Sequence, residues 1–122
     1  AQGKHIQDAK VLVMGATFKE DVSDIRNSKV IDIVNELKSF QVQVDLVDPH
    51  ASSVEMEHEY GIPLASEISK DYDAVIVAVN HAVYIKHDEA YFQSLLKDKN
   101  GVFVDVKGIF KGQMHDLEYW SL

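Results

Sequence analysis

The chain has 122 residues, of which 46% are hydrophobic and 26% charged, and its formal net charge is −8. This length supports one hydrophobic core, and the acidic balance argues against the basic face that a nucleic-acid-binding domain needs. There is no cysteine, which excludes disulfides, thiolate metal sites and a cysteine nucleophile within this chain.

Apolar patterns predict strands that alternate with helices from the start of the chain. A short buried strand at Lys10–Gly15 is followed by a long loop. Apolar residues at helical spacing then predict a helix at Ser28–Phe40, whose first turn Asn27 or Ser28 can cap.

A second strand, predicted at Gln43–Asp48, leads into a second helix. Ser52 or Ser53 can cap this helix, which is expected to end at about Tyr60. Gly61 follows and is a natural helix stop because glycine readily adopts the left-handed conformation.

The chain next crosses to the clearest central strand, Asp73–Val79, whose apolar run is continuous and therefore indicates burial on both faces. Before it, Ile62–Ala65 is at most a short strand because Pro63 lacks a donor. One helical turn is expected at Ser66–Lys70.

The longest apolar run has six residues, far too few to span a membrane, so we expect a cytoplasmic protein without a membrane partner.

The last third of the chain predicts a helix at Asp88–Lys97 and a strand at Val102–Val106. The glycine-interrupted tail, Lys107–Leu122, is expected to be irregular. Alternating strands and helices predict an α/β fold, a Rossmann-like three-layer sandwich with a mostly parallel sheet flanked by helices. No repeat or internal linker divides it.

Ligands of open α/β sheets bind beyond the carboxyl ends of the strands. Lys19 follows the first predicted strand and Lys107 the last. With Arg26 and a helix N-terminus they would suit a pyrophosphate, and Phe18 could support a flat base. Solvated surface lysines remain the alternative interpretation.

The loop after the first strand, residues 16–27, has twelve residues. Connections of this kind typically have about 2–6 residues, and longer ones tend to be functional. A network between Asp24 and Arg26 that only stiffens the loop is an equally open alternative.

The six histidines show no metal-ligand spacing, so surface histidines and no metal site are expected. Asp48, at the end of a strand, resembles the ribose-binding acid of dinucleotide folds. Because no GxGxxG precedes it and Pro49 follows it, a turn-forming role is favoured.

The charged loop carries a resemblance to a known family. Gly15–Ser28 resembles the motif that opens the C-terminal, UDP-binding domain of the UDP-glucose/GDP-mannose dehydrogenase family. The likeness continues through Val44–Pro49 and Val77–His81 and ends with Val104–Gly108. Asp105–Gly108 and the closing Tyr119–Leu122 look most like the branch that oxidises UDP-N-acetylhexosamines.

The resemblance implies an activity and a set of binding residues. Enzymes of the family are NAD-dependent and oxidise the C6 alcohol of a UDP-sugar to a carboxylate, through a thiohemiacetal and a thioester on a cysteine. Phe18 and Lys19 would meet the UDP-sugar, Arg26 would reach the NAD pyrophosphate, and Lys107 would hold the nucleotide part of the substrate.

The resemblance also implies that the chain is one domain of a longer enzyme. Residues 1–9 would be the remnant of an interdomain connection, and 10–122 the UDP-sugar-binding domain. Since neither GxGxxG nor cysteine is present, NAD would be bound mainly by an absent N-terminal domain, and no catalytic residue is expected in this chain.

The isolated domain should therefore be inactive, and the full-length enzyme a homodimer or larger. Two alternatives are a receiver-like signalling module and a structural domain without a ligand. The first strand of a receiver is followed by an acidic cluster, whereas here it ends in Gly15-Ala-Thr17.

Overall fold

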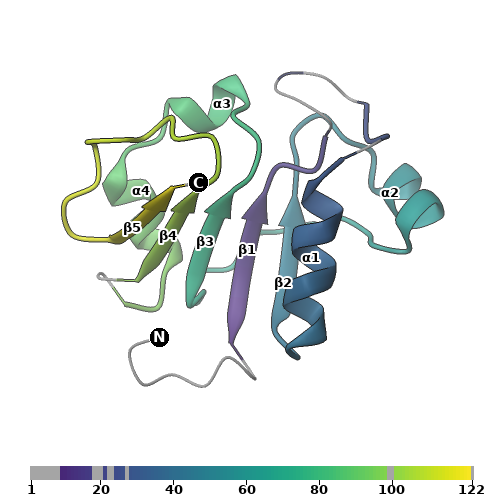
Figure 1. Ribbon diagram of the computed structural model, residues 1–122, viewed down its shortest axis with the longest axis horizontal. Helices are drawn as coiled ribbons and strands as arrows, with labels where there is room; N and C mark the ends of the chain where they lie inside the picture. The colour runs from purple at the N-terminus through teal and green to yellow at the C-terminus, as the bar shows by residue number, and fades with distance from the viewer. Residues whose placement is uncertain (1–8, 18–20, 22–23, 27, 99–100, 122) are drawn as a thin grey trace.

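Five parallel strands form one sheet, and helices cover both of its faces (Figure 1). The computed structural model describes residues 9–17, 21, 24–26, 28–98 and 101–121. The strands are β1 (Lys10–Met14), β2 (Gln43–Val47), β3 (Ala74–Val77), β4 (Val102–Asp105) and β5 (Glu118–Ser121). The helices are α1 (Val30–Ser39), α2 (Ser53–Tyr60), α3 (Ala82–Ile85) and α4 (Glu89–Leu95). The predicted Rossmann-like α/β class is confirmed.

The strand order is β2-β1-β3-β4-β5. The chain leaves β1 in one direction to form β2 and then returns across β1 to form β3. The order therefore reverses between β1 and β3, and such a reversal opens a crevice at the carboxyl ends of the strands where ligands bind.

The side chains of β1 alternate between two cores because successive residues of a strand point to opposite faces. Val11 and Val13 pack with α1 and with Met56 of α2. Leu12 and Met14 face the other core, which is rich in aromatic side chains. Its fully buried aromatic residues are Tyr72, Phe92, Phe103 and Phe110.

The ends of α2 follow the predicted local chemistry. The Ser52 hydroxyl accepts a hydrogen bond from the backbone N–H of Glu55 at 3.3 Å, and Gly61 ends the helix at a φ of 71°. The start of α1 differs, because Lys29 occupies the N-cap without a side-chain hydrogen bond. Ser28 Oγ still accepts from Val30 N at 3.3 Å. Asn27, the other predicted cap, lies outside the described residues.

The prediction of an irregular tail was wrong for its last residues. Glu118–Ser121 forms β5, which pairs with β4 in parallel. The Tyr119 hydroxyl donates to Asp105 Oδ2 at 2.6 Å, which fixes this segment beside β4. Four residues at a sheet edge carry little sequence periodicity, so only the neighbouring strand identifies them.

One further prediction was wrong, and one element was missed. The segment Ser66–Lys70 contains no helical turn. Instead Ser69 Oγ accepts from Lys10 Nζ at 2.8 Å and holds the segment as it approaches β3. A short helix, α3, lies where no element was predicted.

Candidate functional site

The loops after β1 and β3 meet at the point where the strand order reverses. Gly15 begins the first loop with a φ of +107°, and a Cβ atom built on it would lie 2.6 Å from Val79 Cβ and 2.8 Å from Val79 N. Only glycine permits both this φ and this approach. The two loops therefore start from a shared contact.

A buried imidazole joins three loops above that contact. His81 follows β3, and its side chain has no exposed surface. Its Nε2 lies 2.8 Å from Asp48 Oδ2 and 3.2 Å from Thr17 Oγ1, and its Nδ1 accepts from the backbone N–H of Asp21 at 2.8 Å. Because Nδ1 accepts, the hydrogen bonds assign the ring proton to Nε2, which donates to Asp48. The expectation of surface histidines was wrong for this residue.

Asp48 anchors the network with both carboxylate oxygens. Oδ1 accepts from the backbone N–H groups of His50 at 2.7 Å and Ala51 at 2.9 Å, which is the predicted turn-forming role. Oδ2 accepts from Ala16 N at 2.7 Å as well as from His81. Burial by itself would raise the pKa of Asp48, but these hydrogen bonds outweigh it and hold the pKa below its ordinary value.

Asp21 and His50 complete a cluster of possible metal ligands with His81. Asp21 Oδ1 lies 3.7 Å from His50 Nε2 and 3.8 Å from His81 Nδ1. However, His81 Nδ1 already accepts from Asp21 N, and Asp21 Oδ1 accepts from Ala82 N at 2.8 Å. Lone pairs that a metal ion would need are thus used in hydrogen bonds between the loops after β1 and β3. The geometry therefore favours a structural role for the cluster.

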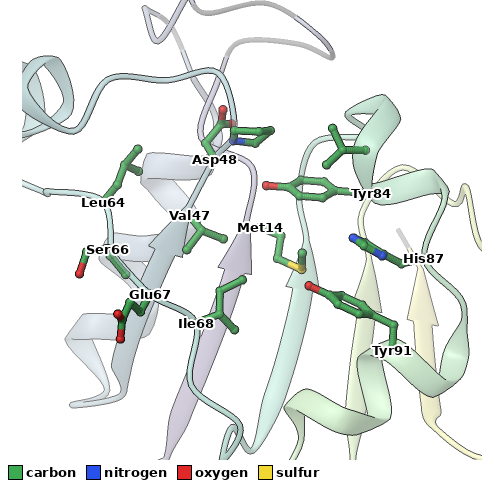
Figure 2. A pocket seen from close by; sticks show the side chains of 13 residues that line it. Met14, Val47, Asp48, Leu64, Ser66, Glu67, Ile68, Tyr84, His87 and Tyr91 are labelled. Atoms are coloured by element: carbon green, nitrogen blue, oxygen red, sulfur yellow. The ribbon is translucent and has the colours of Figure 1, made fainter.

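A cavity of about 330 Å³ lies on the aromatic face of the sheet near the same edge. Figure 2 shows the 64–68 segment on one side of it and Tyr84, His87 and Tyr91 on the other, with Met14 and Val47 between them. The rings of His87 and Tyr91 stack at 3.7 Å. The buried Tyr84 hydroxyl has no hydrogen-bond partner among the described residues, and burial raises its pKa.

Lys107 lies exposed in a turn after β4 that a buried carboxylate anchors. Asp105 accepts from the backbone N–H groups of Ile109 at 3.1 Å and Phe110 at 2.8 Å, and from the Tyr119 hydroxyl. Burial, together with that hydrogen bond, raises the pKa of Tyr119 to about 12. The backbone on both sides of Lys107 is thus held in place while its amino group remains accessible.

Arg26 is also exposed, with 80% of its side-chain surface accessible. Its Nε donates to Asp24 Oδ1 at 3.0 Å and its Nη2 to Asp24 Oδ2 at 3.1 Å. The Arg26 guanidinium holds the pKa of Asp24 below its ordinary value. The structure thus contains the Asp24–Arg26 contact of the loop-stiffening alternative. Phe18 and Lys19, the other predicted site residues, lie outside the described residues.

The sequence interpretation missed that His81 and Asp105 are buried groups that hold the loops, and it gave Asp48 a turn-forming role without its bonds to Ala16 and His81. Asp48, His81 and Asp105 each come at or just after the end of a buried strand. That position, combined with the rule that ligand-binding loops follow strands, was the available signal.

Sheet order and loop placement together define a doubly wound α/β domain with its loops gathered at the reversal of strand order. Residues 12–112 match the UDP binding domain of the UDP-glucose/GDP-mannose dehydrogenase family. The chain belongs to this family, as the resemblance predicted.

Relatives with known names agree with this membership. The chain is 38% identical to the UDP-N-acetyl-D-glucosamine 6-dehydrogenase of Salmonella typhi, over 95% of the chain and 27% of the relative. It is 40% identical to the enzyme of the same name from Pseudomonas aeruginosa, over 93% of the chain and 27% of the relative. The chain thus spans about a quarter of the length of these relatives.

Solved structures show the same fold. The NDP-N-acetyl-D-galactosaminuronic acid dehydrogenase of Methanosarcina mazei Go1 superposes with a TM-score of 0.82 at 19% identity, over 98% of this chain and 26% of that one. The UDP-N-acetyl-mannosamine dehydrogenase Cap5O of Staphylococcus aureus gives a TM-score of 0.69 at 27% identity, over 93% of this chain and 26% of that one. Within the described residues, none of the helices has the length and apolar character to cross a membrane.

Proposed function

We propose that the chain is the UDP-sugar-binding domain of an NAD-dependent nucleotide-sugar 6-dehydrogenase. The full-length enzyme would oxidise the C6 hydroxyl of a UDP-N-acetylhexosamine to a carboxylate and release a UDP-uronic acid. The family match over residues 12–112 carries this proposal. The names of the two bacterial relatives support an N-acetylhexosamine as the sugar.

Lys107 is the described residue best placed to bind the diphosphate of the substrate. Its turn follows β4, two strands away from β1 in the sheet order. Neighbouring strands lie about 4.7–4.9 Å apart, so the ends of β1 and β4 are about 10 Å apart. One nucleotide diphosphate could therefore touch both Lys107 and the loop that contains Phe18 and Lys19.

Arg26 fits a contact with the NAD pyrophosphate. Its guanidinium carries more N–H donors than the two that Asp24 accepts, and most of the side chain is exposed. NAD would supply the hydride acceptor of the reaction. Arg26 would orient its pyrophosphate from this domain, while most other contacts to NAD would come from the N-terminal domain.

The proposed division of the chain follows from these roles. Residues 10–122 would form the substrate domain, and 1–9 would belong to the connection that precedes it. Without the cysteine and the remaining NAD contacts, the isolated domain would have no dehydrogenase activity. The full-length enzyme would form a homodimer or a larger assembly. Family membership favours this proposal over a receiver-like module and over a ligand-free structural domain.

The test is a kinetic comparison of two lysine variants in the full-length protein that carries this chain. NADH formation is measured with UDP-N-acetylglucosamine, UDP-N-acetylgalactosamine, UDP-N-acetylmannosamine and UDP-glucose. We expect Lys107→Ala to raise the KM for the preferred UDP-sugar about tenfold or more, because a hydrogen bond to a charged group contributes about 1.5–3 kcal/mol and about 1.4 kcal/mol corresponds to a factor of ten.

Lys111→Ala is the matched control, because Lys111 is also exposed and lies four residues further along. Its KM should stay within about twofold of the wild-type value, since a solvated surface charge contributes little. Equal kinetics for the wild type and Lys107→Ala would refute the role of Lys107. Absence of NADH formation with every UDP-sugar would refute the proposed function.

A further inference from the structure

His81 contacts both ends of the segment that contains Phe18 and Lys19. Thr17, just before Phe18, places its Oγ1 3.2 Å from His81 Nε2. Asp21, two residues after Lys19, donates its backbone N–H to His81 Nδ1 at 2.8 Å. A single fully buried ring therefore fixes the two residues from which this segment extends.

The contact with Asp21 is reciprocal. Asp21 N donates to His81, and Ala82 N, the residue after His81, donates to Asp21 Oδ1 at 2.8 Å. Asp21 has a φ of 58°, which is unusual for a residue other than glycine. Such a conformation persists where the surroundings impose it, and this pair of hydrogen bonds supplies the constraint.

The imidazole is itself held firmly. Asp48 Oδ2 accepts the Nε2 proton, and three backbone N–H groups fix the Asp48 carboxylate. The rings of Tyr84 and His50 pack edge-on against the imidazole, with centroids at 5.5 and 4.8 Å. A carboxylate that orients a histidine through one ring nitrogen leaves the other nitrogen with a defined direction and protonation state. Here the other nitrogen is Nδ1, which faces the backbone N–H of Asp21 in the loop after β1.

We propose that His81 is a positioning residue for the nucleotide-sugar site. It holds Thr17 and Asp21, and with them the loop after β1, at the edge of the sheet where the proposed function puts the UDP-sugar. This inference rests on the proposed function, because it assumes that Phe18 and Lys19 bind the substrate. Because the His81 side chain has no exposed surface, it would act through Thr17 and Asp21 and not by contact with the substrate.

Two conservative substitutions separate this role from simple support of the fold. In His81→Asn the side-chain oxygen reaches the place of Nδ1, so the acceptor for Asp21 N–H is kept and the donor to Asp48 is lost. In His81→Gln the longer amide reaches the place of Nε2, so the donor to Asp48 is kept and the acceptor for Asp21 is lost. Each variant thus removes one half of the network.

The two variants are compared in the full-length protein by steady-state kinetics and by thermal unfolding. We expect His81→Gln to raise the KM for the UDP-sugar at least fivefold, and His81→Asn to change it less than about twofold. The loss of thermal stability should be larger in His81→Asn than in His81→Gln, because His81→Asn removes a donor from a buried carboxylate. His58→Gln and His58→Asn, at an exposed position of α2, are the matched controls.

A KM that rises in step with the loss of thermal stability, highest in His81→Asn, would overturn the proposal and leave His81 a structural residue. Hydrogen exchange of residues 17–21 is measured on the same samples and does not depend on activity. Faster exchange in His81→Gln than in His81→Asn is expected. If hydrogen exchange differs between His81→Gln and His81→Asn while their KM values are equal, the positioning role of His81 is refuted and the proposed function stands. If the wild type oxidises no UDP-sugar, the proposed function fails first.

Discussion

Gly15→Ala tests whether the close approach of two loops at the reversal of strand order is needed for the fold. The added Cβ would lie 2.6 Å from Val79 Cβ and 2.8 Å from Val79 N, at a φ of +107°. Backbone strain of this kind costs about 1–3 kcal/mol. Overpacking of a well-packed region costs about 1–3 kcal/mol more, so we expect a total loss of about 2–6 kcal/mol.

This loss is large compared with the total stability of a domain, which is about 5–15 kcal/mol. A domain of this size loses about 4 °C in Tm for each kcal/mol, so Tm should fall by about 8–24 °C. Thermal and urea unfolding, followed by circular dichroism, measure both quantities. Lower Tm with an unchanged urea m-value would show that stability fell without a change in the compactness of the native or the denatured state.

Gly61→Ala provides the control because it separates strain from contact. Gly61 also has a positive φ, +71°, but no atom lies within 4 Å of its added Cβ. Gly61→Ala should therefore lower the free energy of unfolding only by the backbone strain of alanine at a positive φ, about 1–2 kcal/mol. If Gly15→Ala is no more destabilising than Gly61→Ala, the approach of the Gly15 loop to Val79 is not the constraint described here.

Two further predictions concern buried polar groups. The pKa of Asp48 lies below its ordinary value of 3.8, so its charged form stabilises the fold above that pH and this stabilisation is lost as pH falls through the folded-state pKa. Urea unfolding at a series of acidic pH values should show that the free energy of unfolding falls less with pH in Asp48→Asn than in the wild type. An equal fall in both proteins would contradict this role of Asp48. Tyr84→Phe removes a buried hydroxyl without a partner among the described residues and should raise the free energy of unfolding by about 1–3 kcal/mol. A lower value in the same urea measurement would mean that the hydroxyl is hydrogen-bonded.

The central strands and the longer helices were predictable because their signals are local. The continuous apolar run that includes β3 indicates burial on both faces, and the helical spacing of α1 defines its buried side. Ser52 and Gly61 mark the ends of α2 through side-chain and backbone preferences of single residues. Such signals need no knowledge of the rest of the fold.

The short elements were not predictable in the same way. β5 has four residues and exists because β4 offers an unpaired edge and Asp105 accepts from Tyr119. The helical turn expected at Ser66–Lys70 is absent, and Ser69 is instead hydrogen-bonded to Lys10 from a distant part of the chain. In both cases a contact between remote residues overrides weak local preferences.

The sequence alone determined the fold class and the family, because apolar periodicity and the charged motif after the first strand can be read from neighbouring residues. It also singled out Lys107 and Arg26 as cations in loops that follow strands, and the structure shows that both are exposed. Only the tertiary structure decided that His81 is buried and that it joins Thr17, Asp21 and Asp48. The physical reason is that a histidine has no intrinsic preference between surface and interior. Its place depends on partners 33 to 64 residues away that only folding brings within hydrogen-bond distance.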